Sequence, residues 1–387
     1  MVPLVIVSFE YGLANGAEGI CTARLVESLR EACDVQVITV RRKRRLREPG
    51  VEDSLPSIAC RPTRVQATLG WVAFRMPVAG WDWAIRVGRL RGRRIRAVYG
   101  RANPLVSLFA AERLAKRCGA PLILHFSDPI PCPWEDLRAN GTRRLVLSVS
   151  KLLRSAALLT FTTPEAMAYA EGIYGCGIPA RSVLVPNITP AWDDGRGLGG
   201  SAGRRELVYV GSFGGARQPD TLLEGLAVHN QMHPGESLGL ALVGTQRAYA
   251  ARATAVLRGR ADVRWVPWTE EVMPHYAGAR IAAVVDADDA QPVFLASKTL
   301  EAIHAARRVL IVSPDGSPAR RLFDHRFRSV VFAHHRPEEV ASQIRRLDAL
   351  LDGEAHAEQR ARREALTDFR GPQVASALVA ALRQVGI

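Results

Sequence analysis

Short apolar runs alternate with stretches of helical periodicity along the chain. Each run has the length of a buried strand and is closed by a turn of glycine, proline or polar residues. The runs occupy residues 2–8, 35–40, 97–100, 121–125, 158–162, 182–185, 206–210, 240–243, 263–266, 281–285 and 309–312. Strands that alternate with helices are typical of parallel sheets covered by helices. The pattern therefore predicts an α/β fold.

A glycine-rich stretch interrupts this alternation halfway along the chain. Residues 189–205 read TPAWDDGRGLGGSAGRR, a composition typical of an interdomain linker. We expect a first domain over residues 1–190, a linker over 191–205 and a second domain over 206–370. Beyond Ser317 the periodicity predicts helices, over residues 337–351, 357–366 and 372–385.

The composition is that of a globular protein large enough for two such domains. The 387 residues are 48% hydrophobic and 23% charged. No run of about 20 apolar residues is present, so we expect no membrane span. The apolar start, MVPLVIVSFE, lacks a basic segment and a cleavage site, and we interpret it as a first strand and not as a signal peptide. Six cysteines without a C-x-x-C spacing favour free thiols in a reducing cytoplasm.

The net charge of +14 comes largely from two basic clusters. Such clusters attract anionic lipid headgroups, nucleic acid or phosphorylated substrates; a solvated arginine-rich surface is the other interpretation. An aromatic segment from residue 68 precedes the second cluster and favours an interfacial membrane helix or an acceptor-binding flap, with a core helix as the alternative. The clusters are Arg41, Arg42, Lys43, Arg44, Arg45 and Arg47, and Arg86, Arg89, Arg91, Arg93, Arg94 and Arg96.

Residues 296–317 contain the strongest candidate for an anion site. Ser297, Lys298 and Thr299 open a predicted helix with Ser297 as its N-cap, so unpaired N–H groups, the helix dipole and a full positive charge meet there. A phosphate is the ligand that such a helix start favours. Glu301 follows on the same face, where its carboxylate can accept hydrogen bonds from sugar hydroxyls. An ordinary capped helix is the alternative interpretation.

A second phosphate candidate follows the strand predicted at residues 206–210. The turn Gly211-Ser-Phe-Gly-Gly-Ala-Arg217 brings a cation to a helix start, which suits a diphosphate with Arg217 as its counter-ion. Trp268 is either a stacking surface for a nucleobase or a buried core residue. Asp286 and Asp288 have the D-x-D spelling of a metal site, but they follow a strand of a nucleotide-binding type of domain, and we do not expect them to bind metal.

His125 and Asp128 are the chemical candidates of the first half. Both follow a predicted strand, and ligands of open α/β sheets lie beyond the carboxyl ends of strands. A histidine can transfer protons near neutral pH, and an aspartate can orient an acceptor hydroxyl. A packed histidine and a turn-forming aspartate are the alternative. Gly16, in the glycine-rich turn 10–19, marks a place where the backbone approaches a ligand or only bends.

Several of these motifs together resemble one family. The run S-K-x-x-E-A-x-x-A-x-R-x-V-L at residues 297–310, followed by S-P-D-G-S, resembles the C-terminal signature of family-four glycosyltransferases with the GT-B fold. The resemblance implies that Glu301 contacts the ribose of a nucleotide-sugar and that the helix start holds its diphosphate. The family carries a second glutamate, in an E-x7-E pattern, where this chain has Val293.

Weaker matches extend the resemblance to the other motifs. The sequence N-G-A-E is similar to the family's G-G-A-E loop, which implies that Gly16 lies near the donor diphosphate. Asp128 belongs to an F-x-D-P motif that, with the preceding R-x-x-P, resembles polysaccharide and natural-product glycosyltransferases. The family's usual turn has two cations, and Ser212 occupies the position of the first and Arg217 roughly that of the second.

The resemblance implies two doubly wound Rossmann-like lobes that face a cleft, with a C-terminal helix at residues 371–387 that crosses back to the first lobe. It also implies a hexosyltransferase that moves a sugar, with retention, from a nucleoside-diphosphate sugar such as a UDP-sugar to an acceptor hydroxyl. Neither a metal nor another cofactor is expected. The residues assigned to the donor are Gly16, Ser212, Arg217, Ser297, Lys298, Thr299 and Glu301, and those assigned to the reacting end are His125 and Asp128.

The expected partners are the nucleotide-sugar, a hydroxyl acceptor with a lipid-linked one as a candidate, and an anionic membrane surface; nucleic acid is not expected. The expected location is the cytoplasm, with attachment to the inner face of the membrane, and the products would be polysaccharides, glycolipids or natural-product glycosides. Two alternatives stay open. They are a sugar-nucleotide epimerase on the same fold, and an inactive scaffold that binds polyanions or membrane surfaces.

Overall fold

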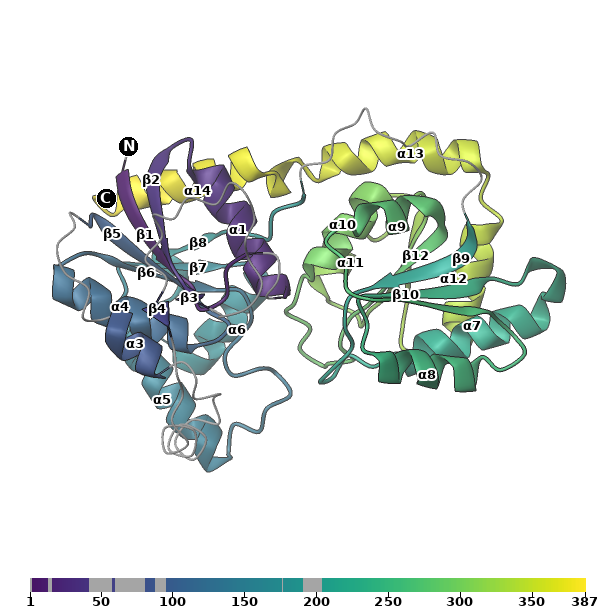
Figure 1. Cartoon of the computed structure of the whole chain (residues 1–387), viewed down its shortest axis with the longest axis horizontal. Helices are drawn as coiled ribbons and strands as arrows, with labels where there is room; N and C mark the ends of the chain where they lie inside the picture. Colours follow the sequence, from purple (N-terminus) through teal and green to yellow (C-terminus); the bar gives the residue numbers. More distant parts are fainter. Residues whose placement is uncertain are drawn as a thin grey trace. The chain divides into compact units, whose positions relative to one another are not determined.

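The computed structural model describes residues 2–12, 16–41, 58–59, 81–87, 95–175, 177–190 and 204–387. The chain forms two compact units, Met1–Ile188 with Phe369–Ile387, and Thr189–Asp368 (Figure 1). Each unit is built on a parallel six-stranded sheet with helices packed against it. The predicted class, two doubly wound α/β units, is therefore confirmed.

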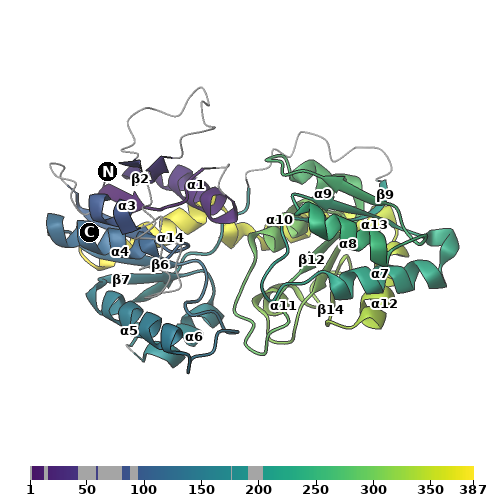
Figure 2. The same cartoon turned by 60° about the horizontal axis from the view of Figure 1, so that its bottom comes forward.

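The sheet of the first unit has the order β2-β1-β5-β6-β7-β8. Helices α1 (Ala17–Leu29) and α14 (Gly371–Gln384) pack together on one face, so the last helix of the chain belongs to the first unit (Figures 1 and 2). A Cβ at Gly100 would lie 2.6 Å from the Ala111 side chain, because α4 (Val106–Cys118) packs closely on β5. The strands are β1 (Val2–Val7), β2 (Cys33–Ile38), β5 (Ala97–Arg101), β6 (Leu122–Phe126), β7 (Leu158–Phe161) and β8 (Ser182–Leu184).

Shorter elements complete this unit. Helix α6 (Pro164–Tyr174) begins with the predicted cap, since the Thr163 hydroxyl accepts a hydrogen bond from the Ala166 amide at 3.0 Å. The remaining elements are β3 (Val40–Arg41), which pairs with β4 (Ile58–Ala59), and the helices α3 (Trp81–Val87) and α5 (Asn140–Ser155).

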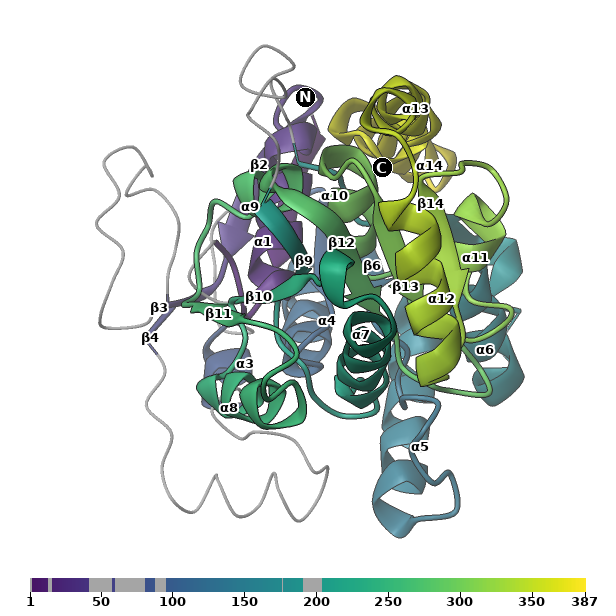
Figure 3. The ribbon, with the colours of Figure 1, turned by 90° about the vertical axis from the view of Figure 1, so that its right-hand side faces the viewer.

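The sheet of the second unit has the order β11-β10-β9-β12-β13-β14. Helices α7 (Asp220–Met232), α8 (Arg247–Val256) and α12 (Pro337–Asp348) contribute to the core on one face, and α9 (Met273–Gly278), α10 (Ser297–Ala305) and α13 (Asp352–Ala365) cover the other (Figure 3). Helix α11 (Pro318–Phe323) follows β13. The strands are β9 (Arg204–Val210), β10 (Gly239–Val243), β11 (Val263–Val266), β12 (Ala279–Val285), β13 (Val309–Val312) and β14 (Val330–Ala333).

Each sheet has one point where the connections leave toward opposite sides. In the first unit β1 lies between β2 and β5, and in the second β9 lies between β10 and β12. The carboxyl ends of such neighbouring strands are separated by diverging connections, which leaves a place for a ligand. The topology therefore directs attention to the residues after β1 and β5, and to those after β9 and β12.

Three expectations differ from the structure. Residues 330–333 form β14, although only helices were predicted beyond Ser317; this strand is short and lies between polar loops. The predicted linker 191–205 ends earlier, because Arg204 and Arg205 already belong to β9, and the rest of it lies outside the described residues. Most of the two basic clusters and of the aromatic segment also lies outside them; Arg86 and Arg96 are described and exposed.

Candidate functional site

In the second unit, a lysine lies at the carboxyl end of β9. Lys298 is the second residue of α10, and its ammonium donates a hydrogen bond to the Tyr209 hydroxyl at 2.8 Å. Its Nζ is 4.6 Å from the centre of the Tyr209 ring. Gly211 follows β9 with φ of 100°, and a Cβ there would lie 3.2 Å from Lys298 Nζ. The left-handed backbone and the neighbouring ammonium both favour glycine at this position.

The charges around Lys298 favour an anionic ligand. The pKa of Lys298 is lowered to about 7, first by burial and then by the positive charge of Arg217, while Asp286 and Glu301 act in the opposite direction. The Arg217 Nε is buried and has no hydrogen-bond partner. An anion bound beside these two cations would stabilise the charged ammonium and satisfy the guanidinium.

Asp286 is a buried acidic residue directly after β12. Its Oδ2 accepts a hydrogen bond from the Ser313 hydroxyl at 2.8 Å, and its Oδ1 is buried without a partner. Burial raises the pKa of Asp286. Among the described residues there is no group of three or more histidine, cysteine or acidic side chains that could hold a metal ion. Asp286 is therefore suited to a hydrogen bond with a ligand hydroxyl.

Glu301 lies one helical turn after Lys298. It is 8% exposed, and its charge, after burial, is the largest influence that raises the pKa of Tyr276. The Tyr276 hydroxyl on α9 is buried and has no hydrogen-bond partner. Such an unpaired buried hydroxyl is costly unless a ligand or water reaches it. Glu301, Tyr276 and Lys298 thus place three polar groups around the start of α10.

The other residues predicted for the donor have varied positions. Ser297 is the first residue of α10 and not its N-cap, because the cap position is occupied by Ala296, which has no side-chain oxygen; this prediction was wrong. Thr299 is fully buried, and its Oγ1 has no partner. Ser212 is exposed, and its carbonyl accepts a hydrogen bond from the Tyr209 hydroxyl at 3.2 Å.

Trp268 follows β11 at the same edge of the sheet. It is 51% exposed, so the alternative of a buried core residue is wrong. A Cβ at Gly244 would lie 3.9 Å from both Cα and Cδ1 of Trp268. An exposed indole beside a glycine turn offers a flat apolar surface that can stack on a base.

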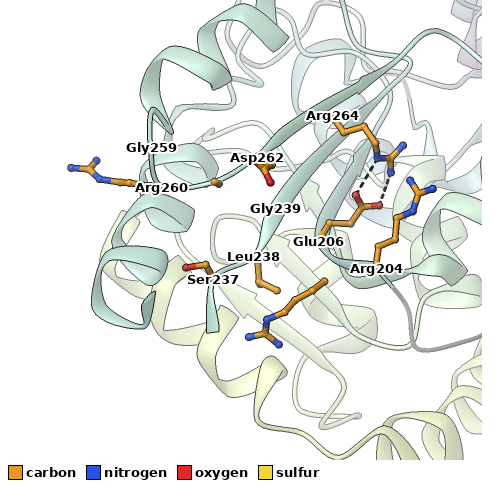
Figure 4. A pocket seen from close by; sticks show the side chains of 11 residues that line it. Arg204, Glu206, Ser237, Leu238, Gly239, Gly259, Arg260, Asp262 and Arg264 are labelled. Carbon is orange, nitrogen blue, oxygen red and sulfur yellow. Dashed lines mark hydrogen bonds and ion pairs between the residues drawn. The ribbon is translucent and has the colours of Figure 1, made fainter. Parts of the chain in front are cut away.

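A separate hollow lies at the other end of the strands of this sheet, where β9, β10 and β11 begin (Figure 4). Its volume is about 620 Å³. Arg264 donates to Glu206 at 3.1 and 2.5 Å, and Arg205 pairs with Asp348 at 2.9 Å. The arginines are thus partly neutralised, and in Figure 4 their guanidinium groups point in different directions. We assign no ligand to this hollow.

In the first unit, a buried ion pair lies at the carboxyl end of β5. Arg101 is 3% exposed and forms a short ion pair with Glu18, in the first turn of α1. Burial raises the pKa of Glu18 to about 7; the Arg101 charge lowers it and the Asp128 charge raises it. The pair therefore ties the start of α1 to the strand that ends beside it.

Asp128 and Gly16 lie near this pair. Asp128 Oδ2 accepts a hydrogen bond from the Asn103 amide at 2.5 Å. Gly16 is the residue before α1 and has φ of 99°, a backbone conformation that favours glycine. Because Glu18 is two residues after Gly16 and senses the charge of Asp128, the predicted residues Gly16 and Asp128 occupy one edge of the first sheet.

His125 is set deeper than Asp128. It is fully buried, its Nδ1 is 2.8 Å from Thr160 Oγ1, and its Nε2 is buried without a partner. Burial and the Arg101 charge hold the pKa of His125 well below its usual value, so the ring is neutral near pH 7. Tyr99 stacks on it with ring centres 5.8 Å apart. In this arrangement His125 belongs to a buried network with Thr160 and Tyr99, and it is not an exposed proton donor.

Sequence analysis missed three residues of these sites as participants. Tyr209 and Tyr276 belong to a strand and a helix that read as ordinary core, and their hydroxyls become relevant only when α10 packs beside them. Glu18 was visible only as part of N-G-A-E. A glutamate followed much later by an arginine at a strand end carries no local signal of an ion pair.

Comparisons with known proteins agree with this architecture. A family model for the glycosyl transferase 4-like domain matches residues 16–188. No curated protein matches this sequence.

Three solved structures illustrate the likeness in fold. HepE from Anabaena, in complex with UDP and glucose, is 13% identical with a TM-score of 0.67, over 99% of this chain and 100% of that one. Sucrose-phosphate synthase from Thermosynechococcus elongatus is 15% identical with a TM-score of 0.69, over 100% and 99%. An α,α-trehalose 6-phosphate synthase from Burkholderia multivorans is 14% identical with a TM-score of 0.65, over 100% and 99%.

Proposed function

We propose that the protein is a glycosyltransferase that transfers a hexosyl group from a UDP-sugar to an acceptor hydroxyl, because a family model for the glycosyl transferase 4-like domain matches residues 16–188 and the whole chain has the GT-B fold. We further propose that the anomeric configuration is retained and that the acceptor is a polysaccharide, glycolipid or natural-product hydroxyl. The choice of UDP is supported by HepE, which has the same fold and was solved with UDP and glucose.

The observation that carries this proposal is the placement of Lys298 and Arg217 at the carboxyl end of β9. Sugar transfer separates charge, because the bond to the diphosphate breaks while negative charge develops on the departing oxygen. Cations held in place before the reaction stabilise that charge without reorganisation. The amides that open α10 add to the same positive field.

The other residues have roles that follow from their environments. Glu301, buried beside this helix start, is assigned to the ribose hydroxyls, and Trp268 to the base. Asp128 is assigned to the acceptor hydroxyl, because its carboxylate can accept a hydrogen bond and orient the attacking oxygen. His125 is assigned a structural role, because it is fully buried and hydrogen-bonded to Thr160, and it need not exchange a proton. Neither a metal nor another cofactor is part of the proposed reaction.

A binding and turnover experiment tests the proposal. Calorimetry with UDP, GDP and ADP should show heat for UDP, and Glu301→Ala should weaken UDP binding by about tenfold, the loss of one or two hydrogen bonds to a carboxylate. Incubation with UDP-glucose and other UDP-hexoses without acceptor should leave the donor intact over minutes. Rapid formation of an epimer would favour the epimerase alternative, and no heat with any nucleotide would contradict the proposal.

The affinity for UDP is expected to depend on pH through Lys298. The folded, ligand-free pKa is about 7, and a diphosphate favours the charged ammonium, so binding above pH 7 requires uptake of a proton. Affinity should change little just below pH 7, where UDP is still ionised, and should fall by up to about tenfold per pH unit above pH 7. Calorimetry in two buffers of different ionisation enthalpy measures the proton directly. A flat profile from pH 7 to 9 would contradict this role of Lys298.

We also propose that the protein associates with an anionic membrane surface through α5. None of the described helices is long and apolar enough to span a bilayer. Helix α5 has no acidic residue, and its Leu147 is 65% exposed. Four basic side chains lie on the exposed side of this helix, namely Arg143, Arg144, Lys151 and Arg154. Exposed Trp134 and Leu137 precede the helix, and this mixture of cations and apolar groups suits an interface.

Co-sedimentation with lipid vesicles tests this surface. Wild type should bind phosphatidylcholine vesicles that contain 30% phosphatidylglycerol far better than pure phosphatidylcholine, since each cation near an anionic surface contributes about 1 kcal/mol. Arg144→Glu with Lys151→Glu should abolish this binding. Arg346→Glu with Arg360→Glu changes the net charge equally on exposed parts of α12 and α13 and is the control. Equal loss in both double variants would contradict the assignment to α5.

A further inference from the structure

The loop after β9 carries little positive charge for a diphosphate site. From Gly211 to Pro219 its only charged residue is Arg217, and Ser212 is neutral. A nucleoside diphosphate brings at least two negative charges to the site, and more develops on the departing oxygen during transfer. A second cation must therefore come from elsewhere in the unit.

Tyr209 connects this loop to α10. Its hydroxyl donates to the Ser212 carbonyl at 3.2 Å and accepts from the Lys298 ammonium at 2.8 Å. A tyrosine hydroxyl can make both bonds at once only while it keeps its proton. Burial raises the pKa of Tyr209 far above neutrality, so the proton is kept.

The Tyr209 ring is fixed by packing. The side chain is fully buried, and the ring stacks on Phe213 with centres 4.0 Å apart and an interplanar angle of 10°. Phe213 in turn packs against Tyr249 at 5.3 Å. A buried ring that is stacked in this way gives its hydroxyl a defined position. The ammonium bonded to it therefore has one preferred place, beside Gly211, where a Cβ would lie 3.2 Å away.

We propose that Tyr209 is a positioning residue that holds the Lys298 ammonium against the loop after β9, so that α10 supplies the second cation that this loop lacks at Ser212. The inference rests on the proposed function, since it assigns both cations to the donor diphosphate. The groups that act on this ammonium are the Arg217 guanidinium, which repels it, the Asp286 and Glu301 carboxylates, which attract it, and the Tyr209 hydroxyl.

The first test removes only the hydroxyl. Tyr209→Phe keeps the ring but leaves the ammonium without its acceptor, so UDP affinity should fall by about tenfold, the value of one hydrogen bond to a charged group. The pH above which affinity declines should also move down, because the lost bond favoured the charged form. Tyr249→Phe removes a hydroxyl from the same aromatic stack and should leave this pH unchanged. If Tyr209 acted only in folding, Tyr209→Phe would lower thermal stability and would leave the pH at which UDP affinity declines unchanged.

The second test moves the positive charge. Lys298→Met should weaken UDP binding, and adding Ser212→Arg should restore part of it, because a long cationic side chain from position 212 starts beside the place that the ammonium occupied. Lys298→Met with Gln218→Arg adds the same charge further along the loop and should not restore binding.

The outcomes separate this inference from the proposed function. Undiminished UDP binding in Lys298→Met would overturn the donor site and with it the proposed function. Weakened binding in Lys298→Met, together with wild-type affinity and pH profile in Tyr209→Phe, would overturn the positioning role alone. Equal recovery with Ser212→Arg and Gln218→Arg, or none with either, would show that α10 does not replace a charge missing at Ser212.

Discussion

Replacing Lys298 with methionine is expected to lower kcat/KM by about 100- to 1,000-fold, the range found when one preorganised group that stabilises transition-state charge is removed. Methionine keeps the length and apolar packing of the side chain and removes only the charge and the bond to Tyr209. Because the departing diphosphate is most negative in the transition state, kcat should fall along with donor affinity. Steady-state kinetics with varied UDP-sugar measures both parameters.

A lysine outside the site provides the control. Lys116 lies on α4 of the other unit, where its side chain is 67% exposed and its ammonium pairs with Glu112 at 2.6 Å. Lys116→Met removes the same charge from the chain and should change kcat/KM less than twofold, since exposed ion pairs contribute about 1 kcal/mol or less even to stability. Equal effects of the two substitutions would show that total charge, and not the position of Lys298, governs the rate.

The second large effect is expected on stability, from Arg101→Leu. This change leaves the Glu18 carboxyl buried without its partner, and breaking a buried ion pair from one side costs about 3–5 kcal/mol. Hydrogen exchange of the β1 and β5 amides should report the loss locally, whereas the strands of the second unit should be unaffected. Arg101→Leu combined with Glu18→Leu should recover most of the stability, because neither charge is then buried.

The cost of Arg101→Leu should depend on pH in a defined direction. The folded pKa of Glu18 is already about 7 beside Arg101, above its unfolded value, and loss of the arginine charge raises it further. Below pH 7 Glu18 is mostly neutral in the folded state of both proteins, so the part of the cost that comes from its ionised carboxylate appears above pH 7 and grows with pH. The protection of the β1 and β5 amides from hydrogen exchange that Arg101→Leu loses at pH 8 should therefore return as the pH is lowered toward 5. The same loss at both values would mean that Glu18 does not cause it.

Both sheets place their polar groups by the same rule. Arg101 ends β5, the neighbour of β1, and Lys298 reaches the end of β9; β1 and β9 are the strands at which the connections diverge. The central strands are apolar and buried over most of their length, so charged groups are tolerated at their ends, where helix starts and ligands can pair with them. In the hollow at the amino ends of β9, β10 and β11, by contrast, Arg264 pairs with Glu206 and Arg205 with Asp348.

The sequence by itself determined most of the strands and helices, and it predicted an anion site at the start of α10. Apolar runs at 263–266 and 309–312 became strands with those same limits, because local patterns of burial set strand boundaries. Lys298 and Glu301 were predictable as a pair, since one helical turn places them on one face. The Ser297 cap failed because the choice between neighbouring cap positions depends on how the preceding chain enters the helix.

Only the tertiary structure decided which groups meet. Tyr209 and Lys298 are 89 residues apart, and Glu18 and Arg101 are 83 apart. No periodicity links such positions, because strand order and helix packing bring them together. Burial then changes what they are: Lys298 acquires a pKa near 7, His125 loses its positive charge, and an ordinary core tyrosine becomes the acceptor for a cation. The sequence specifies the residue types, but their pKa values depend on desolvation and on neighbouring charges, which arise only in the folded protein.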